Sequence, residues 1–334
     1  MLDITAIGEI LIDLTQTGVN EARVPVLAAN PGGAPANVAV AAARLGAGTA
    51  FIGKVGADGF GAYLTGVLRE NGVDVSGLRT GEAATTMAIV SVDAAGERDF
   101  RFVRGADAEL TCGEVDLELV GRSKFLHFGS VSLTGGAARQ TTLYAVEEAR
   151  RRGILVSYDP NYRQALWSSR EEAVEWMKRP LPLVDVLKLS DEELPLLTGT
   201  NDPEQGTAIL RDMGIRLVLL TLGGDGAYYR MGPAAGWVKG VKTAVADTNG
   251  AGDTFLGAVL SRLCRRQERK EQAAGKKGPQ KFVFQAFHVI SPFFPMAKGL
   301  TAYIIRSASE WQFCCIAVAA ASSVDPERRN REQK

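Results

Sequence analysis

The chain has 334 residues, of which 46% are hydrophobic, so it is long enough for one large globular domain or two small ones. Lysine plus arginine and aspartate plus glutamate each number 38, so no global basic field favours nucleic acid or an anionic membrane surface. We therefore expect a small-molecule partner. The N-terminus lacks a basic segment followed by a long apolar core, and no apolar run reaches the roughly 18 residues of a membrane span. These features predict a cytoplasmic protein.

The first predicted element is a strand over residues 4–14 that is interrupted at Gly8-Glu9 and carries Asp13 near its end. An acid at the end of an apolar strand is a candidate ligand. The alternative is an Asp that only opens a turn by bonding its own backbone.

A glycine-rich segment follows, running from Asn30 through Gly32 and Gly33 to Asn37, and it leads into an alanine-rich predicted helix over residues 38–45. The two glycines allow a small ligand to approach the backbone. The Asn37 amide offers both a donor and an acceptor for sugar hydroxyls. A tight turn before a helix is the alternative interpretation.

After a predicted strand over 49–55 and a predicted helix over 58–71, the pattern changes. Two extended runs, 85–92 and 98–103, are joined by a short polar segment, which indicates a hairpin rather than a strand-helix unit. We predict that this hairpin is part of a lid that excludes water from a reactive phosphate. Arg104 follows it, and is either a substrate ligand or a solvated loop arginine.

From residue 125 onward, short apolar strands alternate regularly with amphipathic helices, which predicts an α/β domain with a mainly parallel sheet. Ligands of such sheets lie beyond the carboxyl ends of the strands. This rule selects 159–163, 188–193 and 221–226. The predicted strands are 125–128, 154–159, 184–189 and 217–222, and the predicted helices are 137–152, 170–178, 191–197 and 203–213.

Two of these strand ends have features that suit a nucleotide. Glu193 lies where a carboxylate could order magnesium-bound water around phosphates, although acids at helix starts also occur for dipole reasons alone. The segment from Thr221 to Gly226 is a glycine loop after a strand, but it lacks the lysine of a P-loop.

The segment Asp247-Thr248-Asn249-Gly250-Ala251-Gly252-Asp253-Thr254-Phe255 leads into apolar residues at helical spacing, so a helix is predicted to begin near Gly250. Its unpaired N–H groups and positive dipole end would face an anion. Asp253 would lie beside that anion, where a carboxylate has the task of accepting a proton from an attacking hydroxyl. The alternative is an acid that merely suits the helix dipole.

The two glycine motifs together, Gly32-Gly33-Ala34-Pro35-Ala36-Asn37 and Asp247 to Asp253, resemble the PfkB family of ribokinase-like carbohydrate kinases. Asn30 to Val40 and Asp159-Pro160-Asn161-Tyr162-Arg163 are most similar to fructokinases. The resemblance covers residues 4–263. It implies a three-layer α/β fold with a mainly parallel central sheet, a small β-sheet lid from about 13–35 and 85–104, and ATP-dependent phosphorylation of a sugar hydroxyl.

The resemblance also implies a role for each matching position. Asp253 matches the catalytic base, and the anion hole matches Gly250, Ala251 and Gly252. The positions expected to bind the sugar are Asp13, Gly32, Gly33, Asn37, Arg104 and Arg163. The positions expected to bind the nucleotide are Lys188, Glu193, Thr221, Gly223 and Gly226. The expected cofactors are ATP and Mg²⁺, with Glu193 holding magnesium through water. Asp247 matches a monovalent-cation position, so K⁺ is an additional expectation. Ser190 stands where the family's usual motif has an asparagine.

After Leu263 the family pattern stops, and residues 264–334 are predicted to form a separate C-terminal segment. It begins with a basic stretch and contains two apolar runs, 282–294 and 311–321, instead of the helices that wall the adenine pocket in the family. The resemblance therefore does not predict how residues 264–334 contribute to nucleotide binding.

The leading hypothesis is phosphorylation of fructose to fructose 6-phosphate. A 2-keto-3-deoxygluconate kinase is the first alternative, since a substrate carboxylate suits Arg104 and Arg163, although Met87 weakens it because similar keto-acid kinases often place a tyrosine near there. A catalytically silent relative that serves as a binding or scaffold protein is the second. A homodimer through the exposed lid edge is also predicted.

Overall fold

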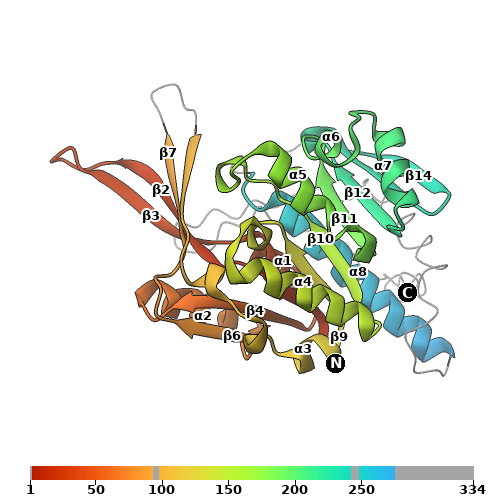
Figure 1. Cartoon of the computed structure of the whole chain (residues 1–334), viewed down its shortest axis with the longest axis horizontal. Coiled ribbons are helices and arrows are strands. Elements are labelled where there is room, and N and C mark those ends of the chain that lie inside the picture. The colour runs from red at the N-terminus through yellow and green to blue at the C-terminus, as the bar shows by residue number, and fades with distance from the viewer. Residues whose placement is uncertain (1, 93–97, 242–247, 275–334) are drawn as a thin grey trace, which may run out of the picture.

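The computed structural model describes residues 2–92, 98–241 and 248–274, and its body is built around a central sheet (Figure 1). The strand order is β14-β13-β12-β11-β10-β9-β1-β4-β5, with β6 also paired to β4. All pairs from β12 to β6 are parallel, whereas β13 and β14 are antiparallel. The strands are β1 (Leu2–Ile7), β4 (Thr49–Gly56), β5 (Val73–Asp74), β6 (Leu78–Gly81), β9 (Ser123–Gly129), β10 (Leu155–Asp159), β11 (Val186–Ser190), β12 (Leu217–Thr221), β13 (Gly226–Met231) and β14 (Ala234–Lys239).

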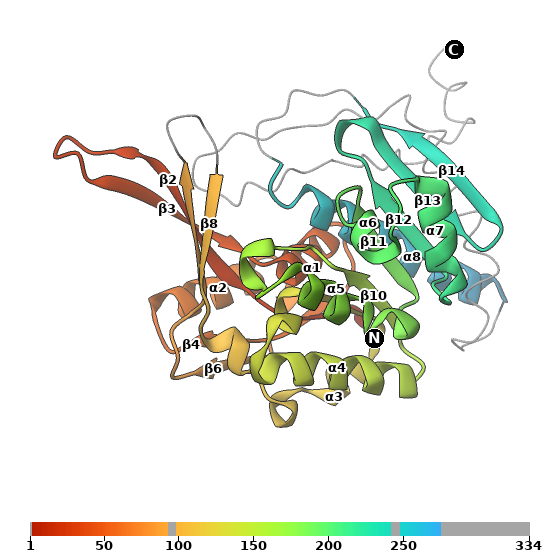
Figure 2. The ribbon, with the colours of Figure 1, turned by 45° about the horizontal axis from the view of Figure 1, so that its top comes forward.

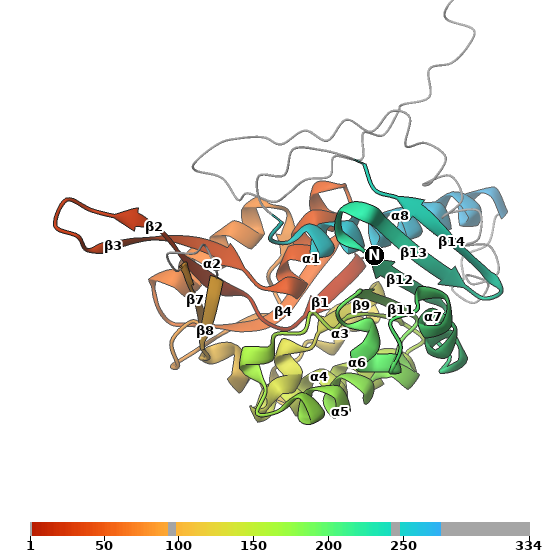
Figure 3. The same cartoon turned by 90° about the horizontal axis from the view of Figure 1, so that it is seen from above.

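Helices cover both faces of this sheet, so the body has three layers (Figure 3). One outer layer contains α1 (Ala34–Arg44), α2 (Gly59–Glu70) and α8 (Ala251–Ala274). The other contains α3 (Leu117–Gly121), α4 (Gly136–Arg151), α5 (Arg170–Lys178), α6 (Leu194–Thr198) and α7 (Pro203–Asp212). The strands are apolar on both sides because both of their faces are buried. In β12, for example, Val218 and Leu220 pack toward the α4 layer, and Leu217 and Leu219 pack toward α8.

A second, four-stranded sheet projects from the body (Figures 1 and 2). Its order is β3-β2-β7-β8, formed by β2 (Leu11–Val19), β3 (Pro25–Gly32), β7 (Met87–Val92) and β8 (Arg98–Val103). We call this sheet the lid. The predicted strand over 4–14 is therefore split at Gly8-Glu9, because its first half pairs in the central sheet and its second half pairs in the lid. The α/β class with a mainly parallel sheet and a separate small sheet is confirmed.

Several local predictions differ from the structure. The helix expected from residue 191 begins only at Leu194, because the Asp191 N–H donates to Thr221 O and extends the turn after β11. The antiparallel pair β13 and β14 was not predicted. Helix α8 continues past residue 263 to Ala274. The domain boundary at residue 263 stays a prediction. Residues 93–97, Asp247 and the run 275–334 lie outside the described residues. No described helix is long and apolar enough to cross a membrane.

Polar side chains replace apolar ones on the α8 side of the sheet, near the carboxyl ends of β9, β10 and β11. His127, Ser157, Asp159 and Lys188 are all buried there. They alternate with apolar neighbours, such as Phe128 and Tyr158, which face the α4 layer. Buried polar groups need partners, so this departure from an apolar pattern marks a site.

Candidate active site

The start of α8 faces the polar strand ends. Gly250 adopts a left-handed φ of 70°, and the Thr254 N–H donates to Gly250 O at 2.8 Å, which closes the first helical turn. A Cβ atom on Gly252 would lie only 2.7 Å from Lys188 Nζ. The predicted residues Gly250, Ala251 and Gly252 therefore form a helix N-terminus without side-chain bulk directly above a buried ammonium group. The Ala251 N–H donates to Thr248 O at 3.1 Å, so the features that suit an anion are the positive end of the helix dipole and the ammonium.

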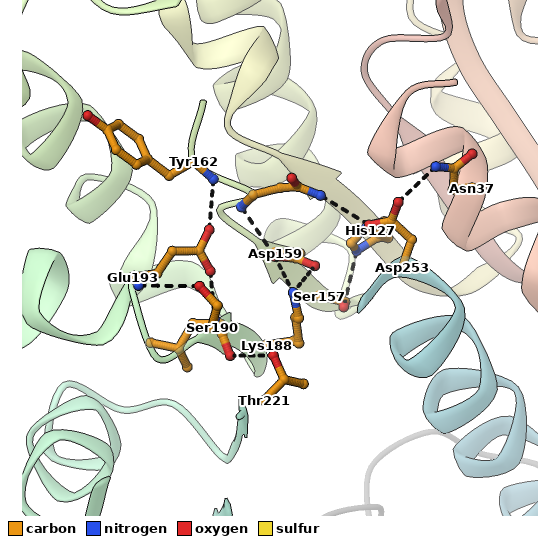
Figure 4. A network of polar contacts seen from close by, with 12 residues as sticks. Asn37, His127, Ser157, Asp159, Tyr162, Lys188, Ser190, Glu193, Thr221 and Asp253 are labelled. Carbon is orange, nitrogen blue, oxygen red and sulfur yellow. Dashed lines mark hydrogen bonds and ion pairs between the residues drawn. The ribbon is translucent and has the colours of Figure 1, made fainter. Parts of the chain in front are cut away.

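Asp253 lies in the first turn of α8 and is 5% exposed. Its Oδ2 accepts a hydrogen bond from Asn37 Nδ2 at 2.8 Å, and its Oδ1 accepts one from Asn161 Nδ2 at 3.0 Å (Figure 4). Burial raises the pKa of Asp253 above its usual value, although Asn37, Lys188 and Arg163 oppose this shift. A buried carboxylate that is held by two amides and has a raised pKa is suited to accept a proton.

Asn161 was not predicted as a site residue, and its position depends on an uncommon backbone conformation. It has a φ of 47°, in the left-handed region that asparagine tolerates better than most residues. Its N–H donates to Asp159 Oδ1 at 3.2 Å, while its side chain reaches Asp253. The sequence signal is the Asp-Pro-Asn run at the end of β10, which places a turn-forming amide at a strand end.

Asp159 and Lys188 form an ion pair beside Asp253 (Figure 4). Lys188 Nζ lies 3.0 Å from Asp159 Oδ2, and their side chains are 8% and 1% exposed. Burial raises the pKa of Asp159 to about 7, against the lowering effect of Lys188. Burial alone would lower the pKa of Lys188, but Asp159, Glu193 and Asp253 together raise it. Lys188 therefore stays cationic under the start of α8.

Glu193 links two of the loops that form the site. Its Oε1 accepts from the Tyr162 N–H and its Oε2 from the Ser190 N–H, each at 2.7 Å (Figure 4). It is 5% exposed. Both oxygens thus already hold backbone groups, and only their remaining lone pairs can accept from a magnesium-bound water. Within the described residues no three His, Cys, Asp or Glu side chains form an all-protein metal site.

The predicted sugar-side residues meet where the lid joins α1. Asp13 and Asn30 are partners in the β2-β3 ladder, and a Cβ on Gly32 would collide with the Asp13 carboxylate. Gly33 has a φ of 106°, and a Cβ there would lie 2.5 Å from Glu9 O. Burial raises the pKa of Asp13 to about 6, while Arg163 lowers it and Asp253 raises it.

The two predicted substrate arginines differ in how they are held. The Arg104 guanidinium is occupied: Nη2 lies 2.7 Å from Asp107 Oδ2, and Nη1 donates to Val131 O and Thr134 Oγ1. Arg163 is exposed, and its Nη1 donates to Tyr162 O at 3.3 Å. Arg163 is thus the more available of the two for a ligand.

The remaining predicted nucleotide residues follow β12. Thr221 lies opposite Ser190 in the β11-β12 ladder, so the two strand ends are adjacent. Gly223 and Gly226 have φ values of 54° and 109°. A Cβ on Gly226 would collide with Val238 O of β14. Packing against β14 therefore requires a glycine at this position, in addition to any contact with a ligand.

Comparison with known proteins identifies the family of this chain. Residues 1–275 match the family described as pfkB family carbohydrate kinase. Fructokinase-1 of Oryza sativa subsp. japonica is 44% identical over 266 residues, which are 78% of this chain and 82% of that protein. Fructokinase-2 of Solanum lycopersicum is 42% identical, over 84% of this chain and 87% of that protein.

Two solved structures have the same fold. A fructokinase from Xylella fastidiosa with bound ATP has a TM-score of 0.73 at 33% identity, and the match covers 79% of this chain and 82% of that chain. A putative ribokinase II from E. coli, in complex with ATP and Mg²⁺, has a TM-score of 0.71 at 26% identity and covers 87% and 98%. The chain therefore belongs to the pfkB family and is a fructokinase-like carbohydrate kinase.

Proposed function

We propose that this carbohydrate kinase transfers the γ-phosphoryl group of ATP to the 6-hydroxyl of fructose, which gives fructose 6-phosphate and ADP. The observation that carries the proposal is the position of Asp253, buried and held by two amides at the start of α8. Several relatives are named fructokinases, and one fructokinase structure contains ATP, which supports both substrates.

Asp253 is the proposed general base. The sugar hydroxyl oxygen attacks the γ-phosphorus, the bond to the β,γ-bridging oxygen breaks, and the hydroxyl proton passes to Asp253. Asn37 and Asn161 fix both carboxylate oxygens, so the group does not have to reorient before it accepts the proton. Its raised pKa makes it a better proton acceptor than an exposed aspartate.

The start of α8 is the proposed anion hole. A Cβ on Gly252 would lie 2.7 Å from Lys188 Nζ, so the glycine lets the start of the helix approach the ammonium, and the two together suit a phosphate oxygen. Lys188 provides a fixed positive charge below it. Charge that develops on the transferring group is then stabilised by groups already in place. Thr221, Gly223 and Gly226 are the proposed nucleotide side.

Mg²⁺ and K⁺ are proposed cofactors of this reaction. Mg²⁺, when bound, would neutralise charge on the phosphates, and Glu193 is the residue proposed to hold it through water. The E. coli relative in complex with ATP and Mg²⁺ supports this expectation. Asp247, the predicted potassium residue, lies outside the described residues.

The sugar is proposed to lie between the lid and α1. Asp13 and Asn37 offer acceptors and a donor for its hydroxyls, with Gly32 and Gly33 giving the close approach. Arg104 is already bound to Asp107, which leaves Arg163 as the proposed arginine contact and weakens the case for a carboxylate sugar that needs both.

The pH dependence of sugar use follows from Asp13. Only its ionised form accepts two sugar hydroxyls, and its pKa is about 6, so kcat/KM for fructose is expected to fall about tenfold per pH unit below that value. Initial rates between pH 5 and 8 measure this. Because the pKa of Asp253 is also raised, Asp13→Asn is needed as a comparison. A variant that keeps the wild-type kcat/KM at pH 7.5 would contradict the role of Asp13.

A panel of sugars tests the substrate. Coupled ADP release with fructose, ribose and 2-keto-3-deoxygluconate should give the highest kcat/KM for fructose. Preference for the keto acid would favour the alternative kinase, in which Arg163 would bind the carboxylate. Absence of turnover with every sugar would overturn the proposed reaction and favour a silent binding protein.

A further inference from the structure

Glu9 is a buried acid next to the proposed sugar site, and the mechanism above does not use it. It lies between β1 and β2, where the chain leaves the body for the lid, and it is 1% exposed. Its Oε1 accepts from the Ala34 N–H at 3.1 Å. Ala34 is the first residue of α1, and Gly33 at the N-cap makes no side-chain hydrogen bond. Glu9 therefore takes the role of the missing cap.

The backbone of Glu9 supports the same loop. A Cβ on Gly33 would lie 2.5 Å from Glu9 O and 3.0 Å from Ile10 Cα, so the two chain segments cross in direct contact. Both the side chain and the main chain of Glu9 thus hold the glycine segment that leads to Asn37. A shift of Glu9 would move the start of α1.

The chain segment that carries Glu9 also reaches the base of the lid, because the N–H of Ile12, three residues further on, donates to Thr86 O at 3.0 Å. Glu9 Oε2 is buried and has no hydrogen-bond partner among the described residues. The charged groups that act on the carboxyl are Asp107 and Arg104, which form an ion pair of 2.7 Å. Arg104 directly follows β8, and Asp107 also bonds Thr86 Oγ1, directly before β7. The ion pair therefore holds both ends of the β7-β8 hairpin.

We propose that Glu9 is a positioning residue that couples the base of the lid to the sugar-binding loop at the start of α1. One oxygen holds the loop, and the charge of the carboxyl acts on the Arg104–Asp107 pair, so a change at either place is transmitted to the other. This inference rests on the proposed sugar site, and its role is to set sugar affinity rather than to take part in phosphoryl transfer.

The protonation state of Glu9 gives the coupling a measurable signature. Burial raises the pKa of Glu9 to about 8, with Asp107 raising it further and Arg104 lowering it. Below pH 8 the neutral acid lies beside Asp107 without repulsion. Above pH 8 a second negative charge competes with Asp107 for Arg104, which loosens the lid base. Sugar affinity should then weaken as the competent neutral form is depleted.

The kinetic test compares wild type with Glu9→Gln, whose side chain keeps an acceptor for the Ala34 N–H but cannot ionise. Between pH 7 and 9 the wild-type KM for fructose should rise about tenfold, whereas that of Glu9→Gln should rise less than about twofold. The KM for ATP should not follow this difference. The matched control is Glu148→Gln, which changes a buried acid of α4 whose Oε2 lies 3.7 Å from Arg152 Nε. Its KM for fructose should rise as much as that of wild type. An equal rise in Glu9→Gln would overturn the proposal.

Backbone amide hydrogen exchange tests the coupling without any turnover. After correction for the intrinsic rate, exchange at residues 33–37 and 84–88 should accelerate together between pH 7 and 9 in wild type and stay constant in Glu9→Gln. Acceleration of only one segment would overturn the coupling. If no sugar is phosphorylated, the proposed function fails on the sugar panel, while this exchange experiment still decides the role of Glu9.

Discussion

Asp253→Asn is expected to lower kcat with fructose by about 10²–10⁴-fold, because the amide cannot accept the hydroxyl proton. The KM for fructose should change far less, since Asn37 and Asn161 still surround the side chain. Coupled ADP release measures kcat, and thermal unfolding checks that the variant is folded. Wild-type turnover by the variant would eliminate Asp253 as the base.

A matched control separates chemistry from helix electrostatics. Asp202 caps α7 by accepting from the Gln205 N–H at 2.7 Å, and its side chain is exposed. Asp202→Asn should leave kcat within about twofold of wild type, because an exposed capping group contributes to helix stability by roughly 1 kcal/mol and to nothing in the reaction. A large loss of kcat here would point to a general effect of removing helix-start acids.

Lys188→Met is expected to have two large effects. It leaves Asp159 buried without its cation, which should lower the free energy of unfolding by about 3–5 kcal/mol. It also removes the positive charge below Gly252, which should lower kcat by about 10²-fold. Urea unfolding measures the first effect, and ADP release at saturating substrates measures the second.

The double variant Lys188→Met, Asp159→Asn distinguishes these effects. Removing both charges should recover most of the lost stability, to within about 1 kcal/mol of wild type, because no unpaired charge is left in the core. Its kcat should stay low, since the charge beneath the proposed anion hole is still absent. Recovery of kcat together with stability would show that Lys188 acts only through folding.

Patterns within one segment predicted most of the fold. The parallel sheet followed from the alternation of apolar strands and helices after residue 125, and the lid hairpin followed from two extended runs joined by a polar turn. The interruption at Gly8-Glu9 was predicted, but not that β1 and β2 pair in different sheets. The sheet that each strand joins depends on pairing partners distant in sequence.

The features of the site that the sequence did not predict depend on contacts between distant segments. Asn37 and Asn161 both bond Asp253 from segments separated from it by 216 and 92 positions. The Asp-Pro-Asn run marks Asn161 only as a turn-forming amide at a strand end, and its bond to Asp253 cannot be predicted from that segment alone. Arg104 was predicted as a substrate ligand or a solvated loop arginine, and the structure shows that Asp107, Val131 and Thr134 bind its guanidinium. Its role as a sugar ligand stays a prediction.

The site of phosphorylation on the product tests the central claim most directly. Purified full-length protein, incubated with fructose and ATP, should release a product that phosphoglucose isomerase converts onward, as it does fructose 6-phosphate. The phosphorus spectrum should show one new monoester, and Asp253→Asn should form it at least about 100-fold more slowly. Fructose 1-phosphate as the product, or equal rates for the two proteins, would contradict the proposed placement of the 6-hydroxyl at Asp253.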